Sequence, residues 1–351
     1  MDFIITLLIL IVILGIIIFG HEFGHFIVAK KCGVYVDEFA LGMGPVLWKY
    51  KPKNSETTYT LRAFPVGGFV SMAEESSPEL KLKKSQILEN KNTFQKLAVL
   101  LMGIVMNFVL AIVLFFISGL FFGKPVSSTE IGAIVDKSPA YTEGLEVGDK
   151  ILEINGVKTY NWDDIILEIS AKKLQAIYEF KVLKADGKTQ VYNIVPKVEK
   201  TKDGEKRSFG VGSSPVKYEK GFVKAVEYGF EGFASNINTI FKIIGSLFTG
   251  KVSIDNLSGP IGIFSIIDNL KSQGLQALIY ITAYLSINVG VINLIPIPVF
   301  DGGRVLLVII ETFTRKRTNI KVENILNYSG FGLMILLMIY VAFNDIIRLI
   351  G

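Results

Sequence analysis

Four long stretches without a single charged residue constrain this chain most strongly. They cover residues 3–19, 97–122, 275–300 and 325–344. An α-helix needs about 20 apolar residues to cross the hydrocarbon core of a bilayer, and each stretch is near or above that length. Half of the residues are hydrophobic and only 20% are charged, which is not the balance of a soluble globular protein. We therefore predict a polytopic α-helical membrane protein with four transmembrane helices.

The first stretch has the length of a secretory signal peptide but lacks its flanks. The chain starts Met1-Asp2-Phe3, so no basic region precedes the apolar run, and no small-residue cleavage site follows it. We expect a retained membrane helix.

Basic residues predict how the spans are oriented. Segment 30–96 contains 11 Lys and Arg residues against 7 Asp and Glu residues. The connection between the third and fourth spans contains Arg304, Arg315, Lys316, Arg317 and Lys321. Because cytoplasmic flanks of membrane spans are enriched in Lys and Arg, both segments should be cytoplasmic and both termini extracytoplasmic. These flanks account for the net charge of +5, so the charge does not indicate nucleic-acid binding.

Three segments outside the spans have recognisable patterns. Residues 57–72 are β-branched and aromatic around a Pro-Val-Gly-Gly break, which predicts a membrane-associated β-hairpin. Residues 124–216 carry short strand patterns and Asn-Gly and Asp-Gly turns, and they predict a small β-rich domain. In 219–250, apolar residues recur at spacings of three and four among Lys and Glu, which predicts an amphipathic helix on the outer membrane surface.

The predicted order of segments follows from these patterns. It is a first span at 1–29, a cytoplasmic segment at 30–96, a second span at 97–122, an extracytoplasmic domain at 124–216, an interfacial helix at 219–250, a third span at 275–303 and a fourth span at 325–347.

The only two histidines of the chain, His21 and His25, lie four residues apart in the string His-Glu-Phe-Gly-His. On a helix, residues at this spacing share one face, with Cβ atoms about 6 Å apart. Together with Glu22, they form the H-E-x-x-H pattern, in which two histidines bind zinc and the glutamate acts as a general base. The motif ends the first apolar stretch, which places it at the cytoplasmic end of a membrane helix.

A catalytic zinc site needs three protein ligands, and the chain has no third histidine. The remaining ligand must be a carboxylate or Cys32. Cys32 is the only cysteine, so no intramolecular disulfide can form, and we expect it to be a free thiol. Asp301 is predicted at the same membrane depth as the histidines, at the inner end of the third span. Two prolines before it and two glycines after it interrupt the helix, and a carboxylate in apolar surroundings requires a partner. Asp301 is therefore the expected third ligand.

This combination resembles the bacterial site-2 protease family of intramembrane zinc metalloproteases. The resemblance is carried by His-Glu-Phe-Gly-His, by Asn-Leu-Ile-Pro-Ile-Pro-Val-Phe-Asp-Gly-Gly at 293–303, and by Gly-Leu-Glu-Val-Gly-Asp-Lys-Ile at 144–151 between them. The last string is similar to bacterial PDZ domains. Ala-Phe-Pro-Val-Gly-Gly-Phe-Val at 63–70 and Ser-Gly-Pro-Ile-Gly at 258–262 are also similar to the family.

The resemblance implies that His21, His25 and Asp301 bind Zn²⁺ and that Glu22 is catalytic. It further implies site-shaping or substrate-binding roles for Asn293, Pro296, Pro298, Gly67, Gly68 and Asn107. Gly67 and Gly68 would offer an edge strand to the substrate, while Asn107 or Asn293 would assist a developing oxyanion. The match at Asn107 is weaker, because Ile104 stands where the family has proline.

The implied function is regulated intramembrane proteolysis in a bacterial cell membrane. The partners would be the lipid bilayer and membrane-spanning substrates already trimmed by another protease, such as anti-sigma factors and signal-peptide remnants. The PDZ domain would contact the outer part or a terminus of the substrate. Two alternatives remain: a catalytically inactive scaffold that binds protein termini, and a metal-ion transporter or sensor. A scaffold would not require the full set of His21, Glu22, His25 and Asp301. A transporter or sensor would be expected to have more metal ligands, distributed over the spans.

Overall fold

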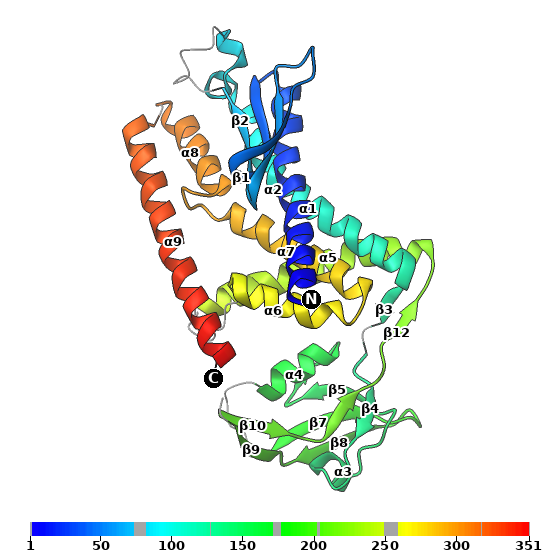
Figure 1. Cartoon of the computed structure of the whole chain (residues 1–351). Coiled ribbons are helices and arrows are strands. Elements are labelled where there is room, and N and C mark those ends of the chain that lie inside the picture. The colour runs from blue at the N-terminus through cyan, green and yellow to red at the C-terminus, as the bar shows by residue number, and fades with distance from the viewer. Residues whose placement is uncertain are drawn as a thin grey trace. The chain divides into compact units, whose positions relative to one another are not determined.

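The computed structural model describes residues 2–73, 82–126, 128–170, 177–201, 204–248, 259–316 and 318–350. The chain divides into two compact units (Figure 1). One consists of Met1–Phe122 and Phe222–Gly351, and the other of Gly123–Gly221. We call them the helical unit and the β-rich unit.

The helical unit contains the long apolar helices. Its helices are α1 (Asp2–Lys31), α2 (Thr93–Phe122), α5 (Phe222–Phe248), α6 (Pro260–Lys271), α7 (Leu275–Leu294), α8 (Asp301–Thr314) and α9 (Ile320–Ile350). Two short 3₁₀ helices, Lys84–Gln86 and Leu88–Asn90, precede α2. Among the described residues, four helices are long and apolar enough to cross a membrane: α1, α2, α7 and the part of α9 from Ile325 to Ile347. The predicted number of candidate spans is confirmed.

The predicted third span is wrong at its end. We expected the third span to cover 275–303 with an interruption near Asp301, but α7 already ends at Leu294 and a separate helix, α8, begins at Asp301. The loop between them contains Pro296 and Pro298. Proline lacks an N–H group for the helical hydrogen bond and restrains the residue before it to extended conformations, so a continuous helix cannot pass through.

The predicted hairpin at 57–72 is also wrong as a self-contained unit. Strand β2 (Thr58–Met72) pairs antiparallel with a strand that the sequence pattern did not indicate, β1 (Val36–Tyr50). Residues 38–41 of β1 lie opposite both 58–61 and 68–71 of β2. The two halves of the predicted hairpin therefore flank β1 instead of pairing with each other.

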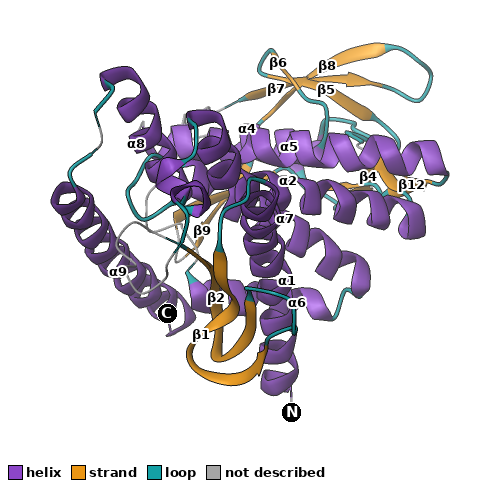
Figure 2. Cartoon of the chain, turned by 90° about the horizontal axis from the view of Figure 1, so that it is seen from above, coloured by secondary structure: helices purple, strands orange, loops and turns teal. Residues whose placement is uncertain are grey.

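Aromatic contacts fasten this sheet to the metal-motif helix. Phe26 of α1 lies with its ring centroid 5.3 Å from that of Phe39 in β1 and 6.0 Å from that of Tyr59 in β2. Phe19 of α1 also meets Phe39, at 6.0 Å. The views of Figures 1 and 2 agree in placing the sheet beside α1. The sheet is thus held against the C-terminal half of α1.

Helix α2 is the central element of the helical unit. Its buried residues Ala111 and Phe115 pack in one cluster with Ile240 of α5 and with Ala283, Ile287 and Val291 of α7. A second cluster joins Ile13 and Ile17 of α1 to Ile267 of α6 and Ile281 of α7. Figure 2 shows α9 at the margin of the helical unit, and the window of α9 that could span a membrane is only 11% buried.

Within the predicted amphipathic segment 219–250, residues 222–248 form the helix α5. Residues 219–221 precede the helix, and residues 249–250 lie outside the described residues. One face of α5 carries Ala225 and Ile240, which are buried against α2 and α7, while Phe230 and Phe241 are exposed. Its place on an outer membrane surface stays a prediction.

The β-rich unit coincides closely with the predicted domain at 124–216. Its four-stranded sheet has the order β6 (Val157–Lys158), β5 (Lys150–Ile154), β7 (Tyr178–Leu183) and β8 (Thr189–Ile194). Three strand pairs complete it: β3 (Lys124–Val126) with β12 (Lys217–Glu219), β4 (Ile131–Ile134) with β11 (Val211–Ser213), and β9 (Lys197–Thr201) with β10 (Gly204–Ser208). Two short helices, α3 (Pro139–Thr142) and α4 (Trp162–Ser170), pack beside the strands.

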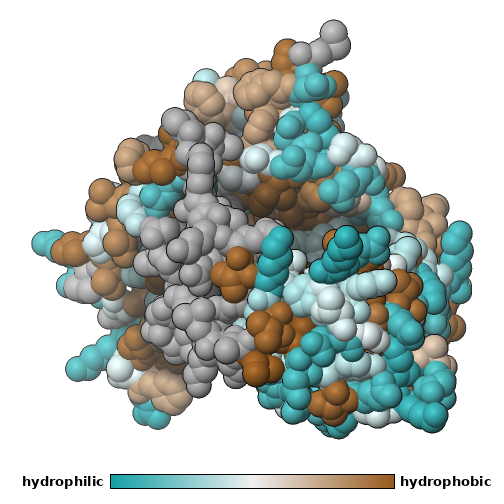
Figure 3. All heavy atoms as spheres, turned by 90° about the horizontal axis from the view of Figure 1, so that it is seen from below, coloured by the Kyte–Doolittle hydropathy of each residue, from teal (hydrophilic) through white to brown (hydrophobic). Residues whose placement is uncertain are grey.

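This unit has a hydrophobic core of its own. Ile151, Ile154, Phe180 and Val182 are fully buried in it, and every residue of the cluster comes from the unit itself. Hydrophilic side chains mixed with apolar ones cover much of the face of the molecule seen from below (Figure 3). The assignment of this unit as a PDZ domain stays a prediction.

Candidate metal centre

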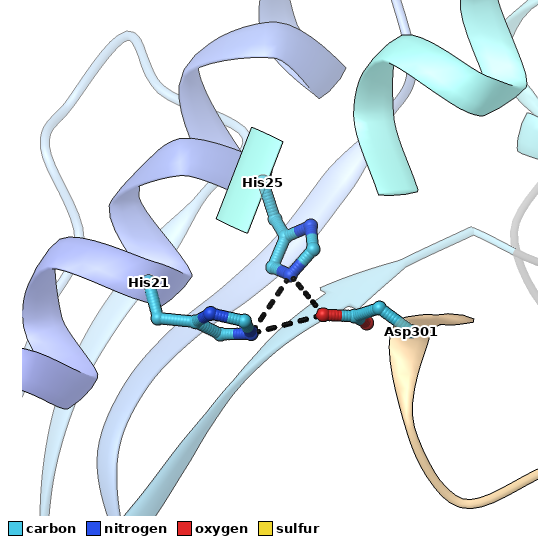
Figure 4. Close-up of side chains that lie close together, drawn as sticks. All are labelled: His21, His25 and Asp301. Carbon is cyan, nitrogen blue, oxygen red and sulfur yellow. Dashed lines mark hydrogen bonds and ion pairs between the residues drawn. The ribbon is translucent and has the colours of Figure 1, made fainter. Parts of the chain in front are cut away.

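The structure brings His21, His25 and Asp301 together. The two Nε2 atoms of the histidines lie 3.2 Å apart, and Asp301 Oδ2 lies 3.0 Å from His21 Nε2 and 3.2 Å from His25 Nε2. Figure 4 shows the three side chains pointing toward one another, the histidines from α1 and the aspartate from the start of α8. We call these three residues the donor triad. Its side chains are only 12%, 8% and 19% exposed, respectively.

The donor triad fits a zinc ion. A tetrahedral zinc ion with ligands at 2.0–2.2 Å separates neighbouring donor atoms by about 3.3 Å, close to the observed spacing. Asp301 Oδ2 is buried and accepts no hydrogen bond from the described residues. A buried carboxylate oxygen without a donor is costly unless a cation compensates it, so this orphaned atom indicates a metal position.

A backbone hydrogen bond orients His25. Its Nδ1 lies 2.8 Å from the carbonyl oxygen of Val99 in α2. Since a carbonyl can only accept, Nδ1 carries the proton in the neutral ring, and the lone pair of Nε2 is then directed at the triad. Zinc-binding histidines are commonly held in this way by a partner on the other ring nitrogen.

Asn107 of α2 occupies the equivalent position behind His21. Its fully buried amide places Nδ2 3.2 Å from His21 Nδ1, while Oδ1 has no hydrogen-bond partner among the described residues. Its backbone carbonyl accepts a hydrogen bond of 2.8 Å from Ser286 Oγ in α7. Asn107 therefore contacts a candidate ligand and links α2 to α7.

Sequence reasoning missed Gly103 as a residue of the site. A Cβ atom at Gly103 would lie 2.3 Å from His25 Nε2 and 2.8 Å from His21 Cε1. On α1, a Cβ at Gly24 would lie 2.4 Å from the carbonyl oxygen of Met102. The two helices thus cross with backbone against backbone where the histidines emerge. Gly103 and Asn107 are one helical turn apart, and this spacing is the sequence signal that could have identified the face.

Two glycines after Asp301 allow α8 to start against the preceding loop. A Cβ at Gly302 would lie 2.3 Å from the Leu294 carbonyl oxygen, and one at Gly303 would lie 2.3 Å from the Ile297 carbonyl oxygen. Any larger residue would push the first turn of α8 away from the loop, and Asp301 with it.

Glu22 lies between the histidine face of α1 and the sheet. A Cβ built on Gly68 of β2 would lie 3.0 Å from Glu22 Cγ and 2.9 Å from Ile18 Cγ2. The Glu22 carboxylate is close enough to interact electrostatically with all three residues of the donor triad. Among the described residues it forms no ion pair with Lys or Arg.

Other predicted site residues are less closely connected to the triad. Asn293 forms no side-chain hydrogen bond with the described residues, and Pro296 and Pro298 lie in the loop that leads to Asp301. Gly67 has a φ of +80° and faces Met43 rather than α1. Cys32 lies beyond the end of α1 and is not part of the triad. In the described part of the chain, the triad is the one group of His, Cys, Asp and Glu side chains close enough to share a metal.

Comparisons with known proteins agree with this chemistry. The model of the peptidase family M50 matches residues 9–337. A provisionally named zinc metalloprotease of Fusobacterium nucleatum is 36% identical, covering 98% of this chain and 99% of its own. The regulator of sigma-W protease RasP of Bacillus subtilis is 31% identical over 99% of both chains. The solved PDZ domain of an SdrC-like protein from Listeria innocua matches 26% of this chain and 99% of its own, at 21% identity and a TM-score of 0.22.

Proposed function

Because the chain belongs to peptidase family M50, the site-2 protease family of zinc metalloproteases, we propose that its zinc ion is held by His21, His25 and Asp301 and that Glu22 is its general base. The observation that carries this proposal is the convergence of three buried donor atoms to within 3.2 Å of one another. The proposed reaction is hydrolysis of a peptide bond within a membrane-spanning segment.

The proposed chemistry divides between the metal and the protein. When bound, zinc lowers the pKa of a coordinated water to about 7 and polarises a carbonyl group as a Lewis acid. Glu22 accepts the proton of the attacking water and later transfers it to the departing amine nitrogen. The Val99 carbonyl and the packing of α2 hold His25 in one orientation. The protein itself therefore contributes proton transfer by Glu22 and alignment of the metal ligands.

We assign Asn107 to positioning His21, in place of the oxyanion role expected from the sequence. With zinc on Nε2, His21 must carry its proton on Nδ1 and needs a hydrogen-bond acceptor there. Rotating the Asn107 amide by half a turn presents Oδ1 to that proton and gives a partner to the oxygen atom that has none. Asn107 Oδ1 then accepts the Nδ1 proton of His21, as the Val99 carbonyl accepts the Nδ1 proton of His25.

The place of the triad suggests the substrate class. His21 and His25 belong to a candidate membrane span, and the motif ends about one turn and a half before the end of α1 at Lys31, which we propose is the cytoplasmic end. A peptide bond reaching this depth belongs to a membrane-spanning segment that has locally unwound. Residues 68–72 of β2 pair with β1 on one side, and Gly68 lies against Glu22. We propose that an unwound substrate adds to this edge as an extra strand, which would hold its peptide bond near Glu22.

We further propose the setting in which the protease acts. The proposed location is a bacterial cell membrane, with the triad near the cytoplasmic side and the β-rich unit and both termini outside. Anti-sigma factors and signal-peptide remnants, already trimmed outside the membrane, are the proposed substrates. The name of the RasP relative, a regulator of sigma-W protease, supports the first of these classes. The β-rich unit would act as a PDZ domain that contacts the outer part of the substrate.

Reconstitution with a model transmembrane substrate tests the proposal. Glu22→Gln should lower the cleavage rate by a factor of about 10²–10⁴, the usual contribution of a general base, while zinc content stays normal. Asp301→Ala and a zinc chelator should each abolish cleavage and lower the zinc content. Glu143→Gln, the same exchange at an exposed position of the β-rich unit, is the matched control. Cleavage that persists in Asp301→Ala or under chelation would refute the zinc assignment.

A further inference from the structure

A polar cavity of about 230 Å³ lies where the first turn of α2 meets the last turns of α8. Thr93 and Lys96 line it from the first turn of α2, and Glu311 and Thr312 from the last turns of α8. Val308 of α8 and the residues after α8, Arg315 and Lys316, complete the lining. We call it the α2–α8 pocket.

The pocket has more positive than negative charge. Lys96, Arg315 and Lys316 contribute three cations, Glu311 one carboxylate, and the excess is two positive charges. Within the described ranges, none of the three cations forms an ion pair, whereas Lys91 nearby is bound through Nζ to the carbonyl oxygen of Cys32. One oxygen of Glu311 accepts a hydrogen bond of 2.8 Å from the backbone N–H of Thr318.

Hydroxyl groups and helix ends complete the polar environment. The Oγ1 atoms of Thr93 and Thr312 lie 3.1 Å apart and bridge the two helices directly. The positive end of the α2 dipole and the negative end of the α8 dipole both face this region, so their effects on an anion oppose each other. The excess charge of the side chains therefore decides the preference, and it favours an anion.

Exposed apolar side chains lie close in sequence to the residues that line the pocket. Phe94, next to Thr93, is 81% exposed, and Phe313, next to Thr312, is 85% exposed. Leu306 and Ile310 on α8 are also exposed. Large aromatic side chains beside basic residues are typical of the level at which a membrane protein meets lipid headgroups. A free anion would use the cations but would leave these apolar side chains uncovered.

We propose that the α2–α8 pocket binds the phosphate headgroup of an anionic phospholipid. This rests on the proposed membrane setting, in which the end of α8 is cytoplasmic. The phosphodiester would meet Lys96, Arg315 and Lys316, and the acyl chains would cover Phe94 and Phe313. Juxtamembrane basic residues are attracted to anionic lipids of the cytoplasmic leaflet.

The position of the pocket gives the lipid a consequence for the metal centre. Helix α2 carries Gly103 and Asn107 against the histidines, and α8 begins with Asp301. A headgroup bound to both helices would restrain the spacing between them. Because α2 packs against the histidines of α1 and α8 carries Asp301, this restraint would help to hold Asp301 Oδ2 near the two imidazoles. Bound anionic lipid should therefore support zinc retention and cleavage.

The test measures lipid binding without any substrate. The full chain, purified in a neutral detergent, is titrated at constant ionic strength with phosphatidylglycerol, phosphatidylcholine or inorganic phosphate, and its thermal unfolding is followed. Phosphatidylglycerol should raise the melting temperature, and the other two should not. In Lys96→Gln/Lys316→Gln the half-saturating phosphatidylglycerol concentration should rise at least about tenfold, from the loss of two basic contacts. Lys51→Gln/Lys53→Gln, with the same charge change on the loop between β1 and β2, should behave as wild type.

Three outcomes would overturn the proposal. If Lys51→Gln/Lys53→Gln raised the half-saturating phosphatidylglycerol concentration as much as Lys96→Gln/Lys316→Gln, general surface charge would be attracting the lipid. If inorganic phosphate raised the melting temperature as much as phosphatidylglycerol, the pocket would be a phosphate site. If phosphatidylglycerol did not raise the melting temperature of the wild type more than phosphatidylcholine, there would be no lipid site. Since unfolding is measured without cleavage, each outcome is independent of whether the proposed proteolysis is correct. Cleavage in phosphatidylglycerol and phosphatidylcholine bilayers then tests the link to the metal centre.

Discussion

The metal centre depends on a residue with no side chain. Gly103 leaves the space into which the His21 and His25 rings fit, and the adjacent Gly24 lets the backbones of α1 and α2 touch. Close crossings of membrane helices commonly use such small residues. A methyl group at Gly103 would occupy the position of the imidazoles, so the geometry of the triad is sensitive to a single carbon atom.

Gly103→Ala should therefore impair the metal centre more than the fold. The added Cβ would lie 2.3 Å from His25 Nε2, so the ring must move by an ångström or more. Misplacement of this size can lower a catalytic rate by about 100-fold. Cleavage rate and zinc content by elemental analysis are the measurements. Gly15→Ala on α1, where no atom lies within 4 Å of the new Cβ, is the control and should be unaffected.

Asn107→Ala tests whether this residue positions His21. Loss of a hydrogen-bond partner behind a zinc-binding histidine typically weakens metal affinity about 10- to 100-fold. We expect zinc to be lost at a correspondingly lower chelator concentration, measured by competition with a fluorescent chelator. Asn107→Asp, which keeps an oxygen acceptor for the Nδ1 proton, should restore much of the affinity. If Asn107→Ala keeps wild-type affinity but still slows cleavage, Asn107 acts on the substrate instead.

Among the helices, the break between α7 and α8 shapes the centre most directly. The prolines end α7 and the glycines let α8 restart close to the same loop, so Asp301 enters the triad as the first residue of a new helix. Helix α9 also reaches this loop, because a Cβ at Gly330 would lie 2.7 Å from Val299 Cγ2. The sequence predicted the interruption but not the second helix, since proline and glycine mark where a helix stops rather than where the chain goes next.

The other end of α9 is fastened by a buried carboxylate. Asp345 is 3% exposed, and it accepts hydrogen bonds from the backbone N–H groups of Gly259, at 3.2 Å, and Gly262, at 2.9 Å, at the start of α6. The family-like string at 258–262 thus has a structural role here, with Ser258 outside the described residues.

Asp345→Ala should loosen α9 from α6. Leaving buried N–H groups without an acceptor costs about 1–3 kcal/mol, so the melting temperature in detergent should fall. Asp345→Asn keeps one acceptor oxygen, so its melting temperature should fall less. Ser329→Ala, at an exposed site on the same helix whose hydroxyl bonds only within α9, is the control. Equal stability of Asp345→Ala and the control would show that α9 is held by other contacts.

The molecule as a whole consists of two units with separate cores. All residues of the buried cluster in the β-rich unit belong to that unit, so residues 123–221 should fold and unfold cooperatively as an isolated fragment. Within it, Lys184 Nζ lies 2.9 Å from Oδ2 of Asp149, a carboxylate that is 1% exposed, and 2.9 Å from Oε2 of Glu146.

Lys184→Ala should destabilise this fragment by about 3 kcal/mol, because it leaves the Asp149 charge buried without its cation. Partial burial acts to lower the pKa of Lys184, but hydrogen bonds to Glu146 and Asp149 outweigh it and raise the pKa above its ordinary value. The stabilisation should therefore be complete below the ordinary lysine pKa of about 10.4 and be lost as the pH rises further. Urea unfolding at pH 8 and pH 11 measures both effects. The exposed Lys188→Ala should change stability by less than about 0.5 kcal/mol.

Several features of this protein follow from the order of its residues alone. Apolar length predicted four candidate spans, and the described part of the chain has four helices of that kind. The scarcity of histidine predicted a carboxylate or Cys32 as the third ligand, and membrane depth indicated Asp301, which the structure places beside both histidines. The zinc-metalloprotease assignment is confirmed by the family match. The spans and the candidate ligands depend on composition and spacing along the chain, and the protease assignment depends on the resemblance of its motifs to a family. None of them needs knowledge of how the segments pack.

Folding in three dimensions settled the rest. The pairing of β2 with β1, the space at Gly103, the carbonyl of Val99 behind His25 and the hydrogen bonds of Asp345 all join segments distant in sequence. Every residue has a backbone carbonyl, so the sequence does not show which carbonyl will accept a hydrogen bond. The role of a glycine depends on which atoms pack against it. Such contacts depend on the crossing points of helices, and those are set by the packing of whole surfaces.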